Sequence, residues 1–363
     1  MRHYRSAIKI VTVNLLVLLL GVAAVELVFG AWFGATYDPR LRLLCNVEYR
    51  FDVSALYAAR EPALYRRDAW CLRGATADPA EVALLTLGGS TTDQRYLGEG
   101  DTWQDRLAAH MQAGGHPLAV ANAGMDGQSS VGHIVALDGW LRRIPRLQPP
   151  YVLLYVGLND VVLGWRADYD GETPAGFWPR AAQYLKTRSA VLGLARLVVG
   201  MAEARLGRLG HAQFAIDEAH ARWVPLVDVA PVRAVLAERL AAYAGRLETL
   251  ERNIRAWGAK AIFVTQPRAD RRLGPAGEML GLIGADGRMD GDTPALGLFN
   301  ETSLAVCRRE GAICIDLAGE LALGDGDYYD LEHYTPAGAE KIGAYLARKL
   351  ATVMAPAAAL ARP

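Results

Sequence analysis

The sequence predicts a three-layer α/β/α sandwich, because short apolar runs alternate with amphipathic helical stretches from about residue 82 onward. Each apolar run is continuous rather than alternating, as is typical of strands buried on both faces of a parallel sheet. The predicted strands are Val82–Leu87, Leu118–Asn122, Tyr151–Val156, Ala261–Thr265 and Ala312–Leu317. The predicted helices are Thr102–Gln112 with Asp101 as a candidate cap, Arg233–Trp257, Leu298–Arg309 and Pro336–Leu350.

An apolar segment at residues 10–33 precedes this pattern, and Asn14 and Glu26 are its strongly polar residues. A bilayer core of about 30 Å needs ~20 apolar residues in a helix, so the segment predicts a transmembrane anchor. Three basic residues come before it: Arg2, Arg5 and Lys9. They favour a cytoplasmic N-terminus and a catalytic domain on the periplasmic side of the inner (cytoplasmic) membrane. A cleaved signal peptide is the alternative, but no clean small-x-small site precedes a polar stretch.

The predicted organisation is a cytoplasmic N-terminus at 1–9, the anchor at 10–33, a polar irregular connector at 34–80, one domain at 81–355 and an Ala-rich tail at 356–363. Residues 161–232 are too long for an ordinary connection between strands, so we expect an insertion or a lid there. Within it, Trp165 and Arg166 could stack on a sugar ring or serve packing.

Charge and cysteine content narrow the function classes. Lys plus Arg and Asp plus Glu number 39 each, and no basic patch stands out, so we expect no nucleic-acid partner.

The cysteines form two local pairs, Cys45 with Cys71 and Cys307 with Cys314. They are either disulfides of an exported domain or buried reduced thiols. No Cys or His spacing is that of a zinc site, so no metal is expected.

Ligands of parallel sheets bind beyond the C-terminal ends of the strands, so the residues after each run are the candidates for chemistry. Ser90 follows the first run, and Asp330 and His333 follow the fifth. A serine needs a base to take its proton, and a histidine has the pKa range to do so near neutrality. An aspartate three residues before the histidine can hold the tautomer that presents a basic nitrogen to the serine. We therefore expect a Ser90–His333–Asp330 triad.

Attack on an acyl carbonyl creates an oxyanion, which needs hydrogen-bond donors already in place. Three strand ends supply candidate donors: the Ser90 N–H, the Gly124 N–H and the Asn159 side chain. Ser90, Gly124 and Asn159 are therefore the predicted oxyanion hole.

The order of these blocks resembles the SGNH branch of the GDSL esterase/lipase family. The matching blocks are Gly88-Gly89-Ser90, Asn122-Ala123-Gly124, Gly157-Leu158-Asn159-Asp160 and Asp330-Leu331-Glu332-His333. The resemblance covers about residues 81 to 352 and implies a flavodoxin-like sheet, ester hydrolysis and no metal or organic cofactor. The family's Gly-Asp-Ser is Gly88-Gly89-Ser90 here, and this variant resembles the Gly-Gly-Ser-Thr form of membrane-anchored envelope members.

The predicted function is a serine esterase that removes O-acyl groups, O-acetyl above all, from an envelope or exported glycan. An O-acyltransferase would use the same acyl-enzyme, with a sugar hydroxyl in place of water. A lysophospholipase and a non-catalytic glycan-binding or assembly module are two more candidate functions.

The remaining polar residues near these blocks have structural interpretations. Asp160 is expected to fix the loop of Asn159, whereas Gln266 or Arg268 could contact substrate. Five histidines have no partner in the pattern and are expected at the surface or on helix faces: His110, His116, His133, His211 and His220.

Overall fold

The computed structural model of the chain describes residues 2–30, 32, 37–41, 43–76, 78–162, 176–205, 209–214, 216–217, 220–227, 229–284 and 286–360. Its centre is a five-stranded sheet in the order β10-β7-β5-β3-β4, in which every neighbouring pair is parallel. These strands are β3 (Leu84–Gly88), β4 (Val120–Asn122), β5 (Tyr151–Tyr155), β7 (Lys260–Val264) and β10 (Ile313–Ile315). Taken in chain order, they follow the 2-1-3-4-5 arrangement of flavodoxin-like sheets. All five predicted strands and the fold class are confirmed.

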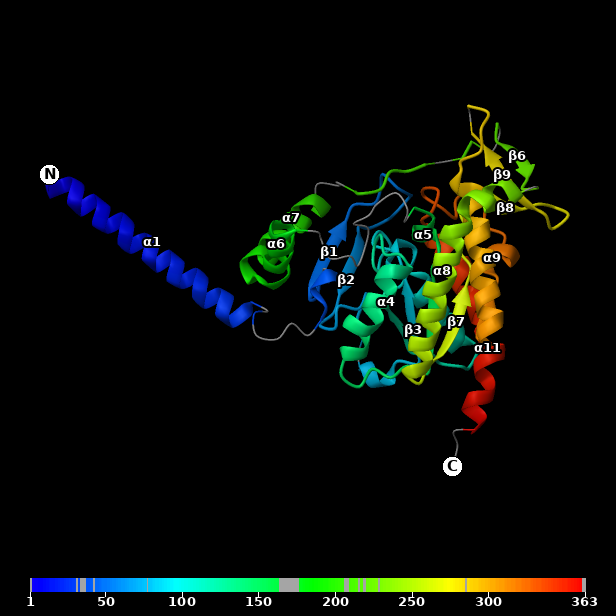
Figure 1. The fold of residues 1–363 in the computed structure, drawn as a ribbon, viewed down its shortest axis with the longest axis horizontal. Helices are drawn as coiled ribbons and strands as arrows, with labels where there is room; N and C mark the ends of the chain where they lie inside the picture. The colour runs from blue at the N-terminus through cyan, green and yellow to red at the C-terminus, as the bar shows by residue number, and fades with distance from the viewer. Residues whose placement is uncertain are drawn as a thin grey trace.

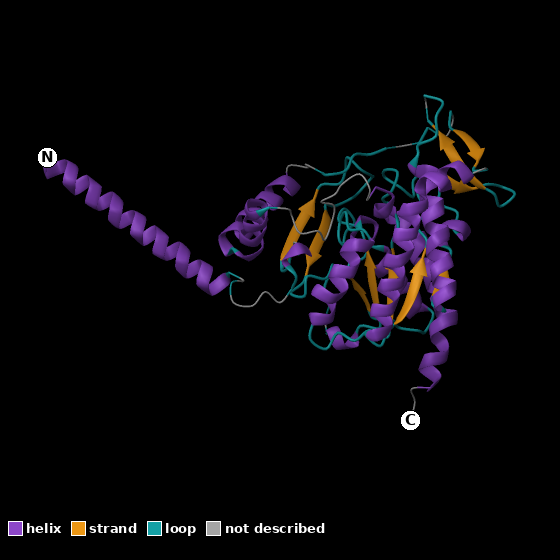
Figure 2. Ribbon diagram, viewed as in Figure 1, coloured by secondary structure: helices purple, strands orange, loops and turns teal. Residues whose placement is uncertain are grey.

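Helices cover both faces of the sheet, which makes the predicted three layers (Figures 1 and 2). On one face lie α4 (Ser130–Gly139), α8 (Ala230–Ala256) and α9 (Asp292–Glu310), and on the other lie α3 (Trp103–Ala113) and α11 (Pro336–Leu360). Successive strand residues serve opposite faces: Leu84 packs with Trp103 of α3, while Leu85 belongs to the core under α4 and α8. The continuous apolar runs follow from this double burial.

Helix α3 has a different cap from the predicted one. The Thr102 side chain accepts from the Asp105 N–H and the Asp105 carboxylate accepts from the Thr102 N–H, forming a capping box. Asp101 instead pairs with Arg106 at 2.6 Å. The reciprocal pair satisfies two N–H groups of the first turn, which a lone Asp101 one residue earlier would not do.

The segment predicted as an irregular connector, 34–80, contains regular structure. Strands β1 (Val47–Phe51) and β2 (Ala63–Arg67) form an antiparallel pair whose residues alternate between buried and more exposed positions. After β2, the Arg73 N–H donates to the Asn122 carbonyl of β4 at 2.8 Å, which ties this pair to the central sheet. The short 3₁₀ turns Pro39–Leu41 and Pro79–Glu81 flank it.

The interval predicted as an insertion or lid holds helices α6 (Phe177–Arg188) and α7 (Ala190–Arg205) and strand β6 (Arg222–Pro225). Strand β6 joins β8 (Arg271–Leu273) and β9 (Met279–Ile283) in a small antiparallel sheet that was not predicted. The remaining short elements are α2 (Ser90–Asp93), α5 (Leu158–Val162), α10 (Leu317–Glu320) and a 3₁₀ turn at Leu141–Arg143.

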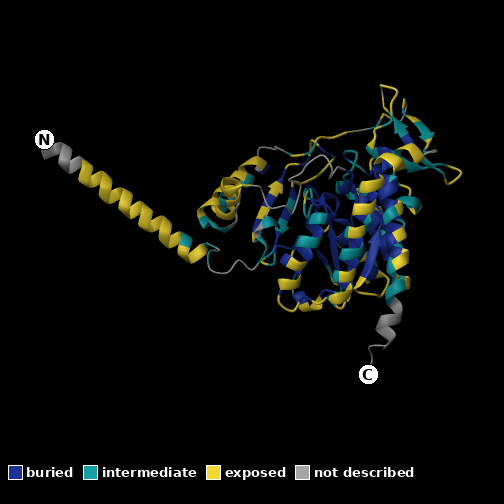
Figure 3. Ribbon diagram, viewed as in Figure 1, coloured by how far each residue is buried: buried dark blue, intermediate teal, exposed yellow. Residues whose placement is uncertain are grey.

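Helix α1 (Arg2–Phe29) extends away from the sandwich, and its side chains from Ile8 onward are mostly exposed (Figures 1 and 3). Its part Ile8–Phe29 is long and apolar enough to cross a membrane, as a single-pass anchor or as a signal sequence. The predicted apolar helix is confirmed, and it ends earlier than the expected residue 33.

Both cysteine pairs are disulfides, which decides between the two alternatives of bonded and reduced cysteines. Cys45–Cys71 joins the segment before β1 to the segment after β2, and Cys307–Cys314 joins α9 to β10. No free cysteine is present among the described residues.

Candidate active site

Ser90 lies at the turn where β3 ends and α2 begins, and it is 7% exposed. Two glycines make this turn sterically feasible. A Cβ at Gly88 would lie 2.1 Å from Thr92 Oγ1, and a Cβ at Gly89 would lie 2.1 Å from Asn159 Nδ2. The Gly-Gly before the serine therefore leaves room for the neighbouring strand ends to close around it.

The predicted triad residues form one hydrogen-bonded chain. His333 Nε2 lies 2.8 Å from Ser90 Oγ, and His333 Nδ1 lies 2.9 Å from Asp330 Oδ2. Asp330 Oδ1 also accepts from the backbone N–H groups of Glu332 and His333, at 2.8 and 2.7 Å. Because Nδ1 donates to the carboxylate, Nε2 keeps the lone pair that can receive the serine proton.

The charges of the pair reinforce this arrangement. Burial by itself would lower the pKa of His333, but the hydrogen bond and negative charge of Asp330, with the charge of Glu332, raise it above its ordinary value. Burial would raise the pKa of Asp330, but its bond to His333, the charge of His333 and two backbone N–H groups lower it. The site therefore favours a carboxylate next to an imidazole that readily becomes imidazolium.

The predicted oxyanion residues lie against the same turn. Asn159 Nδ2 occupies the space beside Gly89 and donates to the Gln128 carbonyl at 2.9 Å. A Cβ on Gly124 would lie 2.2 Å from the Asp93 N atom, so the chain passes closely there too. The Gly124 N–H donates to Asn122 Oδ1 at 2.8 Å. It would therefore have to share this hydrogen with an oxyanion.

His211 belongs to this site, contrary to the expectation that it lies at the surface or on a helix face. Its ring stacks on that of His333 at 4.1 Å, and its Nδ1 lies 2.9 Å from the Tyr329 hydroxyl. Burial, followed by the positive charge of His333, lowers the pKa of His211 to about 4. A neutral imidazole thus covers one face of the candidate base. The sequence around His211 shows no motif that would have revealed this contact.

A buried ion pair beneath the turn that carries Ser90 also escaped sequence reasoning. Arg67 of β2 donates from Nη2 to Asp93 Oδ1 at 2.7 Å and to the Gly124 carbonyl at 2.5 Å, and the Arg67 and Asp93 side chains are at most 5% exposed. The Tyr65 hydroxyl donates to the same carboxylate at 3.1 Å. Strand β2 therefore fixes the loops that carry Ser90 and Gly124. The alternation in Val47–Phe51 was a signal for the strand pair, but nothing in the sequence joined Arg67 to Asp93.

Two further strand-end residues are structural bridges. Gln266 accepts from the Leu158 N–H at 2.7 Å and donates to Thr91 Oγ1 at 2.9 Å, so it connects two loops of the site. Asp160 accepts from the Ser130 N–H at 3.0 Å and pairs with Arg246 at 3.1 Å, which holds the loop after β5.

Arg268, the other candidate for substrate contact, pairs with acidic groups. It lies 3.1 Å from Asp270 and 3.0 Å from Asp290, and its Nε is 3.9 Å from Glu332. Its guanidinium is thus engaged within the protein. Trp165 and Arg166 lie outside the described residues.

None of the other four histidines expected at the surface or on helix faces forms a hydrogen bond or ion pair with a triad residue in the described structure. His133 lies on helix α4, which agrees with the expected helix-face position, and it is buried. It bonds Gln128 Oε1 at 2.8 Å, and burial lowers its pKa to about 3. His110 pairs with Glu340 at 2.6 Å, His220 pairs with Asp217 at 2.8 Å, and His116 is exposed.

One group of side chains in the described chain has donor atoms close enough to hold a metal ion: His211, Asp330 and His333, within 4.8 Å of one another. The same atoms already make the bonds of the triad and of Tyr329. A metal ion at this place would therefore have to replace these hydrogen bonds.

The chain matches the model of the GDSL-like lipase/acylhydrolase family over residues 86–341. No curated protein matches it. Solved structures of similar fold include a lipolytic protein of the G-D-S-L family from Desulfitobacterium hafniense, with 10% identity, 73% of this chain and 97% of that chain covered, and a TM-score of 0.41. A GDSL-like lipase from Bacteroides thetaiotaomicron is 11% identical. The match covers 77% of this chain and 93% of the lipase, with a TM-score of 0.41. An acetylxylan esterase from Geobacillus stearothermophilus is 13% identical. The match covers 74% of this chain and 92% of the esterase, with a TM-score of 0.39.

Proposed function

Because the chain belongs to the GDSL-like lipase/acylhydrolase family, we propose that it is a serine esterase that removes O-acyl groups, O-acetyl above all, from an envelope or exported glycan. The observation that carries this proposal is the hydrogen-bonded chain from Ser90 Oγ through His333 to Asp330. A nucleophile, a base and a group that orients the base, all within bonding distance, are the parts that acyl transfer needs.

The reaction begins when Ser90 Oγ attacks the ester carbonyl carbon while His333 Nε2 takes the hydroxyl proton. The carbon–oxygen bond to the sugar then breaks, and His333 gives that proton to the departing sugar oxygen. Water next attacks the acyl-serine and passes a proton to His333. The bond to Ser90 Oγ breaks, the proton returns to it, and the carboxylic acid leaves.

The oxyanion of each tetrahedral intermediate is assigned to the Ser90 N–H, the Asn159 amide and the Gly124 N–H. Asn159 supports this role best, because its Nδ2 lies directly beside residue 89. Donors fixed in a buried turn need little rearrangement when the negative charge forms.

The location follows from the N-terminal helix. We assign α1 to an uncleaved single-pass anchor in the inner membrane, with the catalytic domain on the periplasmic side. Two disulfides support an oxidising compartment, and the basic residues before the apolar segment favour a cytoplasmic N-terminus. A reporter fused after residue 363 should be active only if it works outside the cytoplasm. Activity of a cytoplasm-only reporter would contradict this orientation.

The activity is tested by acetate release from short-chain aryl esters and from purified envelope glycans, with the wild type beside Ser90→Ala. We expect release from both substrates by the wild type and none above background by the variant. Release from aryl esters alone would refute the glycan assignment. Movement of the acyl group onto a sugar hydroxyl without acetate release would identify a transferase instead.

A further inference from the structure

Helices α6 and α7 carry an unusual concentration of exposed apolar side chains. Outside α1, twelve large apolar residues of the described chain are exposed, and nine of them lie between residues 177 and 199. These nine are Phe177, Trp178, Tyr184, Leu185, Val191, Leu192, Leu194, Val198 and Val199. Scattered apolar residues on a surface are ordinary, but a cluster of this kind marks a contact with another apolar phase.

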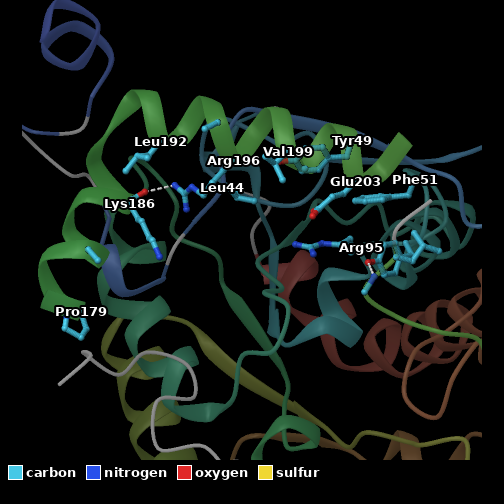
Figure 4. Close-up of a pocket in the computed structure, with 16 residues that line it drawn as sticks. Leu44, Tyr49, Phe51, Arg95, Pro179, Lys186, Leu192, Arg196, Val199 and Glu203 are labelled. Carbon is cyan, nitrogen blue, oxygen red and sulfur yellow. Dashed lines mark hydrogen bonds between the residues drawn. The ribbon is translucent and has the colours of Figure 1, made fainter. Parts of the chain in front are cut away.

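The apolar residues of α7 face two directions. Leu192 and Val199 line a cavity of about 1110 Å³, which Tyr49 and Phe51 of β1 also line (Figure 4). Val191, Leu194 and Val198 do not line this cavity, and their i, i+3, i+7 spacing places them in one stripe. The stripe is therefore exposed on a side of the helix that the cavity does not explain.

Helices α6 and α7 follow one another with only Ser189 between them, and we call them the α6–α7 hairpin. This hairpin contacts the apolar helix α1 directly. The Glu26 carboxylate, in the last turns of α1, accepts from Ser189 Oγ at 2.5 Å and from the N–H groups of Ala190 and Val191 at 3.0 and 3.2 Å. It thus satisfies the free N–H groups at the start of α7. Figure 1 shows the C-terminal end of α1 beside the hairpin. If α1 spans a membrane, this contact holds α6 and α7 at the level where the span ends.

The amino-acid composition of α6 and α7 also fits a position at the end of the membrane span. Residues 177–204 contain four basic residues, Arg180, Lys186, Arg188 and Arg196, and one acidic residue, Glu203. Phe177 and Trp178, which begin α6, are 74% and 79% exposed. Helices that lie in a membrane interface combine exposed aromatic and aliphatic residues with Lys and Arg, which attract anionic lipid.

We propose that the α6–α7 hairpin lies in the surface of the membrane that α1 enters, with anionic phospholipid as its binding partner. The Val191–Leu194–Val198 stripe and Trp178 contact the acyl chains, and the basic side chains contact lipid phosphates. The proposal does not depend on the esterase activity. It also fixes which side of the domain faces the bilayer. The cavity under α7 extends to Tyr96, whose ring packs edge-on against that of His211 at 5.0 Å.

The first test uses the full chain in nanodiscs that contain phosphatidylglycerol with brominated or ordinary acyl chains. Bromine quenches tryptophan emission only at short range, so the difference between wild type and Trp178→Phe isolates the emission of Trp178. We expect the emission of Trp178, obtained by this subtraction, to be at least twofold lower in brominated lipid than in ordinary lipid. The matched control is Trp257→Phe at the end of α8, whose difference emission should be the same in both lipids. Equal emission of Trp178 in both lipids would overturn the proposal.

The second test replaces the stripe. Leu194→Asp with Val198→Asp should restore the Trp178 emission at least halfway toward its unquenched value, because the hairpin leaves the acyl region. Val235→Asp, at an 84% exposed apolar residue of α8, should change nothing. Aryl-ester hydrolysis should stay unchanged in both variants. If the hairpin instead covers a second copy of the chain, Trp178 stays unquenched and cross-links join two hairpins, which would refute the lipid contact.

Discussion

The polar groups at the strand ends and the apolar groups of the α6–α7 hairpin are held in different ways. Ser90, His333 and Asp330 each have hydrogen-bond partners at 2.7–3.0 Å, so their positions are fixed inside the protein. Val191, Leu194 and Val198 are at least 41% exposed. The protein itself therefore holds the groups of the candidate active site, whereas the hairpin presents its apolar groups for the lipid contact proposed above. The following variants test how firmly the candidate active site is held and what each of its groups does, from the largest expected effect to the smallest.

The largest effect is expected at the nucleophile and the base. Ser90→Ala and His333→Ala should each lower kcat by about 10⁵–10⁶, and the double variant should be little worse, because the two groups act as a unit. Stopped-flow and long-time assays with an aryl ester measure this loss. Multiplicative losses in the double variant would mean that Ser90 and His333 work independently.

Asp330→Asn keeps the shape of the side chain but favours the wrong imidazole tautomer, so kcat should fall by about 10⁴. The pH profile adds a separate readout. In the wild type, activity should be lost as the pH falls through the pKa of His333, which lies above the ordinary pKa of histidine. The variant lacks the charge that raises this pKa, so its acidic limb should move to lower pH. An unmoved limb would show that Asp330 does not control His333.

Arg67→Met tests the buried pair that fixes the nucleophile turn. Removal of one partner leaves the Asp93 carboxylate buried without its main counter-charge, which should cost about 3–5 kcal/mol in the free energy of unfolding. The matched control, Arg66→Met, breaks a pair with Glu99 that is partly exposed and should cost about 0–1 kcal/mol. Urea unfolding of the full chain in detergent compares them. Similar losses in both variants would argue against a special role of the Arg67–Asp93 pair.

Asn159→Ala deletes one candidate oxyanion donor and should lower kcat by about 10²–10³ with KM little changed, because the negative charge exists only in the transition state. Steady-state kinetics with an aryl ester separate the two constants. A rise in KM at constant kcat would mean that Asn159 binds the ground state instead.

The smallest effect is expected at His211. His211→Gln removes the ring that covers His333, and we expect a loss in kcat of less than about tenfold, because the triad bonds remain. His220→Gln is the control, since His220 is exposed and bonds only with Asp217 in the described structure. A pH profile of both variants distinguishes an effect on the pKa of His333 from general destabilisation. A loss as large as that of Asp330→Asn would make His211 a catalytic residue.

The sequence predicted the parts whose signals are local. Five continuous apolar runs became the five parallel strands, because strands buried on both faces need no polar positions. The residues after those runs include Ser90, Asn159, Asp330 and His333, because parallel strands end at one side of the sheet. Their meeting was therefore predictable without knowledge of the loops.

The contacts that sequence analysis missed are nonlocal. Arg67 meets Asp93, and His211 meets His333, across long stretches of chain with irregular sequence between them. Arg67 and His211 are also residue types that usually lie at the surface, so composition pointed the wrong way. The β1–β2 pair was overlooked because charged residues such as Glu48 and Arg50 alternate with its apolar ones. That alternation is the signature of a strand with one buried face.

The two disulfides lie near the two edges of the central sheet. Cys314 is the middle residue of β10, and Cys71 lies two residues before Arg73, whose N–H is bonded to Asn122 of β4. An outermost strand with free backbone groups is a template for pairing with another chain, and short or covered edges reduce that risk. Each disulfide ties a segment at one edge of the sheet to another part of the domain, which would hold that edge in place in the oxidising compartment proposed for it.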